Sequence, residues 1–335
     1  MFFKNNILFK PIWRVFTFLF IVILALFVAY LIWTPGYIDR SKTIDMKKNG
    51  LWLAHGWIGA DEWFEKYKKD KNKYRTPESY NTLNSRIKTL NIEYIFPHLC
   101  PSTIQGKIAK YDNKAIESLL NNTNVKVLPW IGGVLGGSAF PEKEYWRDNF
   151  VASIKILLDE NPKLAGIHIN IEPLPSGNKG FILLLKSIKA VIGENRILSL
   201  ASYPPPSFLH PHNDVHWEKE YYETLSTIID QHVVMMYDTA LSNHKLYQYL
   251  YSKWVQQVLK WSANKEVLFG IPVYDDTGVG YHNPETENVL NAIKGLYSGL
   301  AKSSAGNYAG MSIYCNWELD EQEIETIKKV FINYK

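Results

Sequence analysis

Short apolar stretches and amphipathic stretches alternate along most of this chain after residue 50. The apolar stretches are rich in Ile, Val and Leu, as in strands that are covered on both faces, and the stretches between them have the periodicity of helices. The expected strands cover residues 51–56, 93–98, 126–131, 165–172, 197–203, 232–237, 267–274 and 310–317. The expected helices cover residues 79–90, 113–120, 146–160, 180–192, 218–229, 244–262, 285–300 and 321–334.

This alternation of eight strands with eight helices predicts an α/β fold with parallel strands and helical crossovers. The number of strands favours a closed (β/α)8 TIM barrel over residues 51–335. A doubly wound open sheet is the alternative. The Gly-x-Gly-x-x-Gly motif that often follows the first strand of such a sheet does not occur here, and we therefore expect the barrel.

A different pattern occupies the N-terminus, where residues 15–33 are apolar except for Thr17 and Tyr30. A run of this length predicts a transmembrane helix. Three basic residues and no acidic residue precede it, which places the N-terminus in the cytoplasm and the barrel outside the cell. No small-x-small cleavage site follows, so a single-pass signal anchor is favoured over a removed signal peptide or a buried core helix. We expect a cytoplasmic stub and anchor over residues 1–34 and a polar linker over residues 35–50.

Charge and cysteine content narrow the functional classes. The net charge is +4, and the basic residues before the apolar run account for three of these charges, so the sequence gives no electrostatic reason to expect nucleic-acid binding. The Lys-rich residues 66–75 are expected to form a solvated loop, with contact to an anionic wall polymer or lipid as the alternative. Cys100 and Cys315 are expected to be buried thiols, and a single bridge between them remains an alternative.

Residues 165–172 carry the most specific pattern in the chain. Successive side chains of a strand point to opposite faces, so one face of this strand is formed by Ile residues and the other by His168, Asn170 and Glu172. Glu172 lies at the carboxyl end of the strand, which is where catalytic groups lie in an α/β barrel. Several other expected strands end in polar or aromatic residues that would converge on the same mouth, namely Trp130, Tyr203, Tyr237, Asp238, Tyr274 and Trp317.

A carboxylic acid beside an amide suits one form of glycoside hydrolysis. Most glycosidases use two carboxyl groups. In an alternative mechanism the 2-acetamido group of the substrate attacks the anomeric carbon, so the enzyme needs one acid and a neighbour that orients the acetamide. Asn170 and Glu172 are two residues apart on one face, about 7 Å by strand rise. Burial of Glu172 would also raise its proton affinity, as a general acid requires.

These residues resemble glycoside hydrolase family 18, the chitinase family. Residues 165–172 are similar to its signature Asp-Gly-x-Asp-x-Asp-x-Glu: Gly166 and Glu172 match, and the three aspartates are replaced. Residues 235–238 match the family's Met-x-Tyr-Asp strand, and residues 270–274 resemble its seventh-strand motif. The resemblance implies that Glu172 is the acid/base, that Tyr237 contacts the acetamide and that Trp317 stacks on the sugar.

The replacement of an aspartate by Asn170 is similar to the Asn-x-Glu strand of the family 85 endo-β-N-acetylglucosaminidases. That resemblance implies that Asn170 orients the acetamide without a metal or an organic cofactor. The remaining expected substrate contacts are His168, Asp238, Tyr274, Trp130 and Tyr203. A metal cluster formed by His210, His212 and His216 is disfavoured because their spacing fits no standard zinc pattern.

The resulting hypothesis is a membrane-anchored extracellular glycosidase, chitinase-like or an endo-β-N-acetylglucosaminidase. It would cleave β-linked N-acetylglucosamine (GlcNAc)-containing glycan with retention. One alternative is a catalytically inactive barrel that binds cell-wall glycan or a protein partner. Another is a hydrolase of unrelated mechanism that pairs Glu172 with Glu318 or Asp238. Chitin, peptidoglycan and N-glycans all carry the acetamide group that the first hypothesis needs.

Overall fold

The computed structural model describes residues 9–276, 278, 280–304 and 306–332. The chain divides into two compact units, Met1–Pro35 and Gly36–Lys335. The first unit contains helix α1 (Phe9–Ile32). Within it, Trp13–Ile32 is long and apolar enough to cross a membrane, with a mean hydropathy of 3.0.

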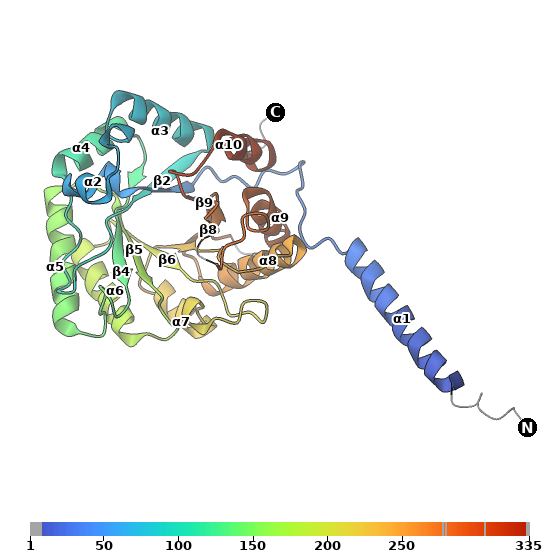
Figure 1. The fold of residues 1–335 in the computed structure, drawn as a ribbon. Coiled ribbons are helices and arrows are strands. Elements are labelled where there is room, and N and C mark those ends of the chain that lie inside the picture. The colour runs from blue at the N-terminus through green and yellow to red at the C-terminus, as the bar shows by residue number, and fades with distance from the viewer. Residues whose placement is uncertain (1–8, 277, 279, 305, 333–335) are drawn as a thin grey trace, which may run out of the picture. The chain divides into compact units, whose positions relative to one another are not determined.

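The second unit is a ring of parallel strands surrounded by helices (Figure 1). Its sheet has the order β3-β2-β1-β9-β8-β7-β6-β5-β4, in which neighbours in sequence mostly pair with one another. The strands are β1 (Asn49–Leu53), β2 (Ile92–Pro97), β3 (Lys126–Val127), β4 (Trp130–Val134), β5 (Gly166–Glu172), β6 (Ile197–Ser202), β7 (Gln231–Val234), β8 (Glu266–Pro272) and β9 (Tyr308–Tyr314). The helices are α2 (Glu62–Tyr67), α3 (Pro77–Thr89), α4 (Asn113–Asn122), α5 (Glu144–Glu160), α6 (Lys179–Ile192), α7 (Lys219–Ser226), α8 (His244–Trp261), α9 (Val289–Leu300) and α10 (Glu321–Ile327).

The expected third strand is interrupted, which explains why nine strands replace eight. β3 pairs with β2, and β4 pairs with β5. Pro129 lies between them and has no N–H to donate to a ladder. The two edges still meet, because the backbone N–H of Leu99 donates to the carbonyl of Trp130 at 2.7 Å. The ring therefore closes, and the predicted (β/α)8 barrel is confirmed.

Two hydrophobic layers hold the barrel together. The Ile side chains of β5 at positions 167, 169 and 171 belong to the large cluster that also includes residues from the surrounding helices. A smaller cluster includes Trp52, Phe96 and Trp130. The ring of His168 lies 4.3 Å from that of Phe96, so the polar face of β5 turns toward this second cluster. The alternation along β5 thus separates the two layers.

Several element ends differ from expectation, and two of the differences affect the site. β7 ends at Val234 and β9 at Tyr314, three residues earlier in each case than the alternation suggests. The expected last helix, residues 321–334, is α10 followed by a π-helical turn, Lys328–Ile332, and its end lies outside the described residues. The Lys-rich residues 66–75 include the end of α2 and the 3-10 turn Lys71–Lys73.

The segment that precedes β1 packs against the barrel. The backbone N–H of Tyr37 donates to Ser298 Oγ at 3.2 Å, and the Tyr297 hydroxyl donates to the Lys42 carbonyl at 3.0 Å. The carboxylate of Asp45 accepts hydrogen bonds from the side-chain amides of Asn49 and Asn91. Much of the stretch that the sequence assigned to a linker is therefore bound to the folded unit.

Candidate active site

A cavity of about 600 Å³ opens among the carboxyl ends of the strands, the catalytic end of such barrels. Six of the expected site residues line it: Trp130, Asn170, Glu172, Tyr203, Tyr237 and Asp238. The wall is completed by Trp52, Val134, Pro173, Ala201, Pro204, His210, His212, Asp214, Val215, Met235, Tyr281 and Tyr314.

Asn170 and Glu172 are coupled directly. The side-chain amide Nδ2 of Asn170 donates a hydrogen bond to Oε1 of Glu172. Gly132 allows β4 to lie against this point of β5, since a Cβ atom at position 132 would lie 1.5 Å from the carbonyl oxygen of Asn170. The register of β4 and β5 sets Val134 opposite Glu172. The acid and the amide are therefore held together by a closely packed strand pair.

The surroundings of Glu172 favour its protonated form. Burial raises the pKa of the Glu172 carboxyl, and the negative charge of Asp238 raises it further. The hydrogen bond from Asn170 opposes these effects because it stabilises the carboxylate. The net pKa lies above the ordinary value, as a group that protonates a leaving oxygen requires.

Aromatic rings form one side of the cavity. The rings of Tyr237 and Tyr314 are stacked, with centroids 5.3 Å apart and an interplanar angle of 19°. Burial raises the pKa of Tyr237 well above its ordinary value, so its hydroxyl stays neutral and able to donate. Gly270 makes room for this ring, since a Cβ atom there would lie 2.9 Å from Cε1 of Tyr237. Tyr237 can therefore present both a flat apolar face and a hydrogen-bond donor.

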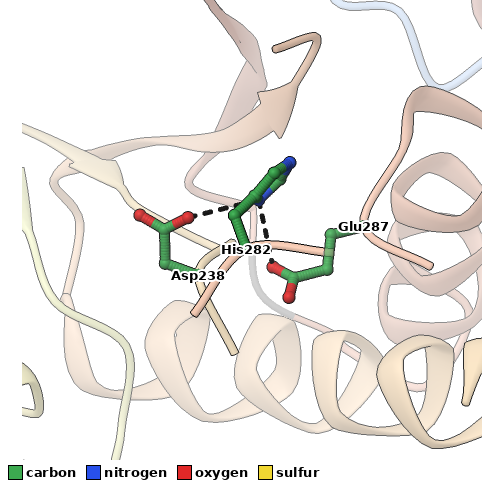
Figure 2. A group of neighbouring side chains, drawn as sticks. All are labelled: Asp238, His282 and Glu287. Atoms are coloured by element: carbon green, nitrogen blue, oxygen red, sulfur yellow. Dashed lines mark ion pairs between the residues drawn. The ribbon is translucent and has the colours of Figure 1, made fainter. Parts of the chain in front are cut away.

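Asp238 connects the cavity to a buried group of side chains, shown in Figure 2. The hydroxyl of Tyr274 donates to Oδ1 of Asp238. Nδ1 of His282 lies 3.2 Å from the same oxygen and 3.8 Å from Oε2 of Glu287. In the described part of the chain, Asp238, His282 and Glu287 are the one group of His, Cys, Asp or Glu residues with three ligand atoms within 4.8 Å of one another.

His168 lies in the barrel interior and has no exposed surface. Its Nδ1 donates to Ser199 Oγ at 2.8 Å, because the Ser199 hydroxyl itself donates to Gln231. Its Nε2 accepts from Trp52 Nε1 at 3.3 Å. Burial lowers the pKa of His168 to about 3, so the ring is neutral. The expected substrate contact of His168 is not supported, because both ring nitrogens are used within the core.

Trp317 and Tyr274 also lie elsewhere than expected. β9 ends at Tyr314, so Tyr314 lines the cavity, while Trp317 lies beyond it in the following turn. The Trp317 side chain is 42% exposed and lines a neighbouring groove of about 340 Å³. Tyr274 is buried behind Asp238 rather than at the cavity surface. The expected direct contacts of Trp317 and Tyr274 with a sugar in the cavity are thus corrected.

The sequence interpretation missed two loops that build the cavity wall. One follows β6 and contributes His210, His212 and Asp214; the other follows β8 and contributes Tyr281. Nδ1 of His210 and Nε2 of His216 share a hydrogen bond at 2.9 Å, so these two imidazoles are partners of each other. The concentration of histidine in residues 210–216 was the available signal, but loops have no periodicity that shows where they fold back.

The two cysteines are separate free thiols. Cys315 is buried beside the end of β9, and the Sγ atom of Cys100 lies 3.5 Å from the carbonyl oxygen of Trp130. Burial raises the pKa of Cys100 well above its ordinary value, and the nearby carboxylate of Glu172 contributes to the shift. Neither thiol is set up as a nucleophile.

The fold is shared with solved glycosidase structures of low sequence identity. Spore cortex-lytic enzyme SleL of Bacillus megaterium QM B1551 matches with a TM-score of 0.57 and 13% identity, covering 85% of this chain and 74% of that one. A chitinase of Chromobacterium violaceum matches with a TM-score of 0.57 and 14% identity, over 84% and 98% of the two chains. A fungal endo-β-N-acetylglucosaminidase of family 18 matches with a TM-score of 0.55 and 15% identity, over 86% and 98%.

Sequence comparison gives a more specific result. No sequence among the curated proteins matches the chain. The family model described as "Glycosyl hydrolases family 18", in contrast, matches residues 64–329, which include the β5 acid and most of the barrel. The chain therefore belongs to glycoside hydrolase family 18.

Proposed function

We propose that this protein hydrolyses β-linked GlcNAc-containing glycan by a substrate-assisted, retaining mechanism. The observation that carries the proposal is the hydrogen-bonded pair of Asn170 and Glu172 at the wall of the cavity. The raised pKa of Glu172 suits a group that first donates a proton and then accepts one from water. The glycosidase fold and the structural relatives named above support the same reaction class.

In the first step, Glu172 protonates the glycosidic oxygen while the acetamide oxygen of the substrate attacks the anomeric carbon. The C–O bond to the leaving sugar breaks, and a cyclic oxazolinium intermediate forms. Asn170 and Tyr237 orient the acetamide, and Asp238 provides negative charge close to the positive intermediate. In the second step, Glu172 takes a proton from water, which attacks the anomeric carbon from the side that the leaving group vacated. Two inversions give net retention.

The Asn-x-Glu strand supports comparison with the family 85 enzymes, whose pair of residues serves the same chemistry. Asn170 can donate a hydrogen bond but cannot take up a proton as an aspartate would. The structural neighbours include a chitinase, an endo-β-N-acetylglucosaminidase and a spore cortex-lytic enzyme. Chitin oligomers, N-glycans and peptidoglycan are therefore the substrates to test.

We further propose that α1 anchors the protein in the cell membrane with the barrel outside. Its apolar length and the basic residues that precede it support this topology. Fractionation of cells, followed by protease treatment of intact cells, tests it directly. A barrel that resists protease until the cells are lysed, or a mature protein that lacks residues 1–34, would contradict the proposal.

The decisive experiment for the activity uses the full-length protein in detergent micelles with Glu172→Gln as the variant. We expect release of reducing ends from at least one of the three substrates, and about a 10³-fold loss in the variant. Glu142→Gln, at an exposed surface carboxylate, is the matched control and should behave as wild type. Binding of GlcNAc oligomers without hydrolysis by the wild-type protein would instead support the inactive, glycan-binding barrel. Activity that survives in the Glu172 variant would contradict its role as the acid.

A further inference from the structure

We propose that His282 and Glu287 are positioning residues for the reaction, and that together they hold the carboxylate of Asp238 fixed at the cavity wall. This inference rests on the proposed function. Both residues are buried, and neither is among the described residues that line the cavity.

Both carboxylates of this group face the same nitrogen of the imidazole (Figure 2). Asp238 lies at the cavity wall, and Nδ1 of the buried His282 is directed at its Oδ1 and at Oε2 of Glu287. Nε2 of His282 donates to the carbonyl oxygen of Tyr274 at 2.9 Å. Because a carbonyl can only accept, this bond fixes a proton on Nε2 and turns Nδ1 toward the two carboxylates.

The charges favour a second proton on Nδ1. Burial by itself lowers the pKa of His282, but the interactions with Asp238 and Glu287 outweigh it and raise the pKa above its ordinary value. Glu287 is only 1% exposed, and Thr239 donates to it from both its backbone N–H and its hydroxyl. Burial raises the pKa of Glu287 to about 7, and the bonds from Thr239 and the charge of His282 oppose this rise. The two carboxylates favour the imidazolium, and a cation beside Asp238 holds that side chain in place.

The backbone supports a positioning role. Asp238 has a φ of +64° and Ala240 a φ of +55°, in the left-handed region that non-glycine residues rarely occupy. Such conformations cost on the order of 1 kcal/mol each and persist where surrounding contacts hold them. Tyr274 and His282 contact the side chain of Asp238. Thr239, which lies between Asp238 and Ala240, is held by hydrogen bonds to Glu287.

A proton fits this cluster better than a metal ion. The Asp238 oxygen that faces His282 already accepts the hydroxyl of Tyr274. Both oxygens of Glu287 accept from Thr239. The rings of Tyr274 and His282 are also stacked, with centroids 3.9 Å apart, which restricts movement of the imidazole. The carboxylate lone pairs are therefore largely engaged by hydrogen-bond donors, and a proton at Nδ1 completes the pairing.

His282 and Glu287 affect catalysis indirectly, because they hold Asp238 and Asp238 interacts with Glu172. Asp238 raises the pKa of Glu172 by its negative charge, so the two groups are close enough to interact. Three carboxylates line the described cavity wall, those of Glu172, Asp214 and Asp238. Glu172 is the acid, and Asp238 is held by the buried network, so Asp238 is the group placed to balance the positive intermediate. The placement of its carboxylate should therefore affect kcat more than KM.

The test compares kcat and KM for His282→Gln, Glu287→Gln and Glu287→Asp in the full-length protein in micelles. In His282→Gln, the Asp238 carboxylate loses the partner that holds it in place. We expect kcat to fall about 10²-fold, as for a misplaced catalytic group, with KM changed less than about threefold. Glu287→Gln should lower kcat in the same way, and Glu287→Asp, which keeps the charge, should restore most of the wild-type kcat.

His232→Gln is the matched control, because His232 is equally buried but its ring nitrogens contact only the hydroxyls of Ser202 and Ser226. It should lower the melting temperature and leave kcat unchanged. If the His282 and Glu287 variants lose stability but keep the wild-type kcat, their role is structural and the inference is overturned. Loss of activity with a chelator, restored by Zn²⁺, would also overturn it in favour of a metal site.

A second readout does not depend on turnover. Histidine-selective NMR of the wild-type protein should show one imidazole that titrates above pH 6.5, absent in His282→Gln and shifted down in Glu287→Gln. A His282 signal that titrates below 6.5 would overturn the inference even if the enzyme is active. If the wild-type protein hydrolyses none of the substrates, the proposed function fails, and this titration still decides the charge on His282.

Discussion

The side-chain amide of Asn170 donates a hydrogen bond to Oε1 of Glu172, two residues along the same strand. An amide at this position supports the carboxylate form of Glu172 and so limits the rise of its pKa that burial causes. It also leaves Nδ2 with one further hydrogen to donate. Asn170 can therefore influence the protonation of Glu172 and at the same time donate a hydrogen bond to a group bound in the cavity.

Removal of this hydrogen bond should change both rate and pH dependence. In Asn170→Ala the pKa of Glu172 should rise, because the bond that lowers it is lost. We therefore expect the basic limb of kcat/KM to move to higher pH, with kcat lower by about 10²–10³-fold. Asn170→Asp, which adds a negative charge next to Glu172, should move the basic limb further in the same direction. A basic limb that moves down in either variant would contradict the coupling.

Replacement of the acid should stabilise the fold at neutral pH. The pKa of Glu172 is higher in the folded protein than its ordinary value of 4.5, so the ionised group destabilises the folded state. This penalty is full above the folded pKa and disappears as the pH falls toward 4.5. Glu172→Gln should therefore raise the melting temperature by about 2 °C at pH 8 and have no such effect at pH 4. Scanning calorimetry at the two pH values checks this.

His168 should prove to be a stability residue. His168→Ala removes the partner of Trp52 Nε1 and of the Ser199 hydroxyl and leaves a cavity in the barrel interior. We expect a loss of about 2–4 kcal/mol in the free energy of unfolding, measured by urea denaturation, with KM close to that of wild type. A raised KM with unchanged stability would contradict this role and would support a contact between His168 and the substrate.

The buried neutral histidines should make the fold sensitive to acid. Burial lowers the pKa of His98, His168 and His232 to about 3, whereas the unfolded chain binds these protons near pH 6.5. Each therefore contributes stability that is present above pH 6.5 and is lost as the pH falls toward 3. Between those limits each histidine changes the free energy of unfolding by about 1.4 kcal/mol per pH unit. In His232→Gln the pH dependence of unfolding should be shallower by that amount.

The place of Trp317 outside the main cavity predicts a dependence on substrate length. Trp317 lines the neighbouring groove, whereas Tyr314 lines the cavity that holds Glu172. Trp317→Ala should raise KM for long GlcNAc oligomers by about tenfold through loss of stacking, and leave the cleavage of a short reporter glycoside unchanged. Tyr314→Ala should impair both substrates. Equal effects of Trp317→Ala on long and short substrates would contradict this arrangement.

The strand–helix alternation and the place of Glu172 were open to prediction because both depend on local periodicity. The alternation along residues 165–172 determines which side chains share a face, whatever the neighbouring strands do. The closed barrel followed from the number of strands. The ends of β7 and β9 were harder to predict, because the apolar pattern continues beyond Val234 and Tyr314 while the hydrogen bonds between strands do not.

By itself, the sequence determined the order of elements, the Ile face of β5 and the position of an acid and an amide at its end. The tertiary structure alone decided that His168 is a core residue, that Tyr314 rather than Trp317 reaches the cavity, and that Glu287 stands behind Asp238. These outcomes depend on contacts between segments far apart in the chain, such as His168 with Trp52 over 116 residues. Hydrophobic periodicity reports only which way a side chain faces within its own element. Which groups meet is set by the closure of the ring and the return of the loops over its mouth.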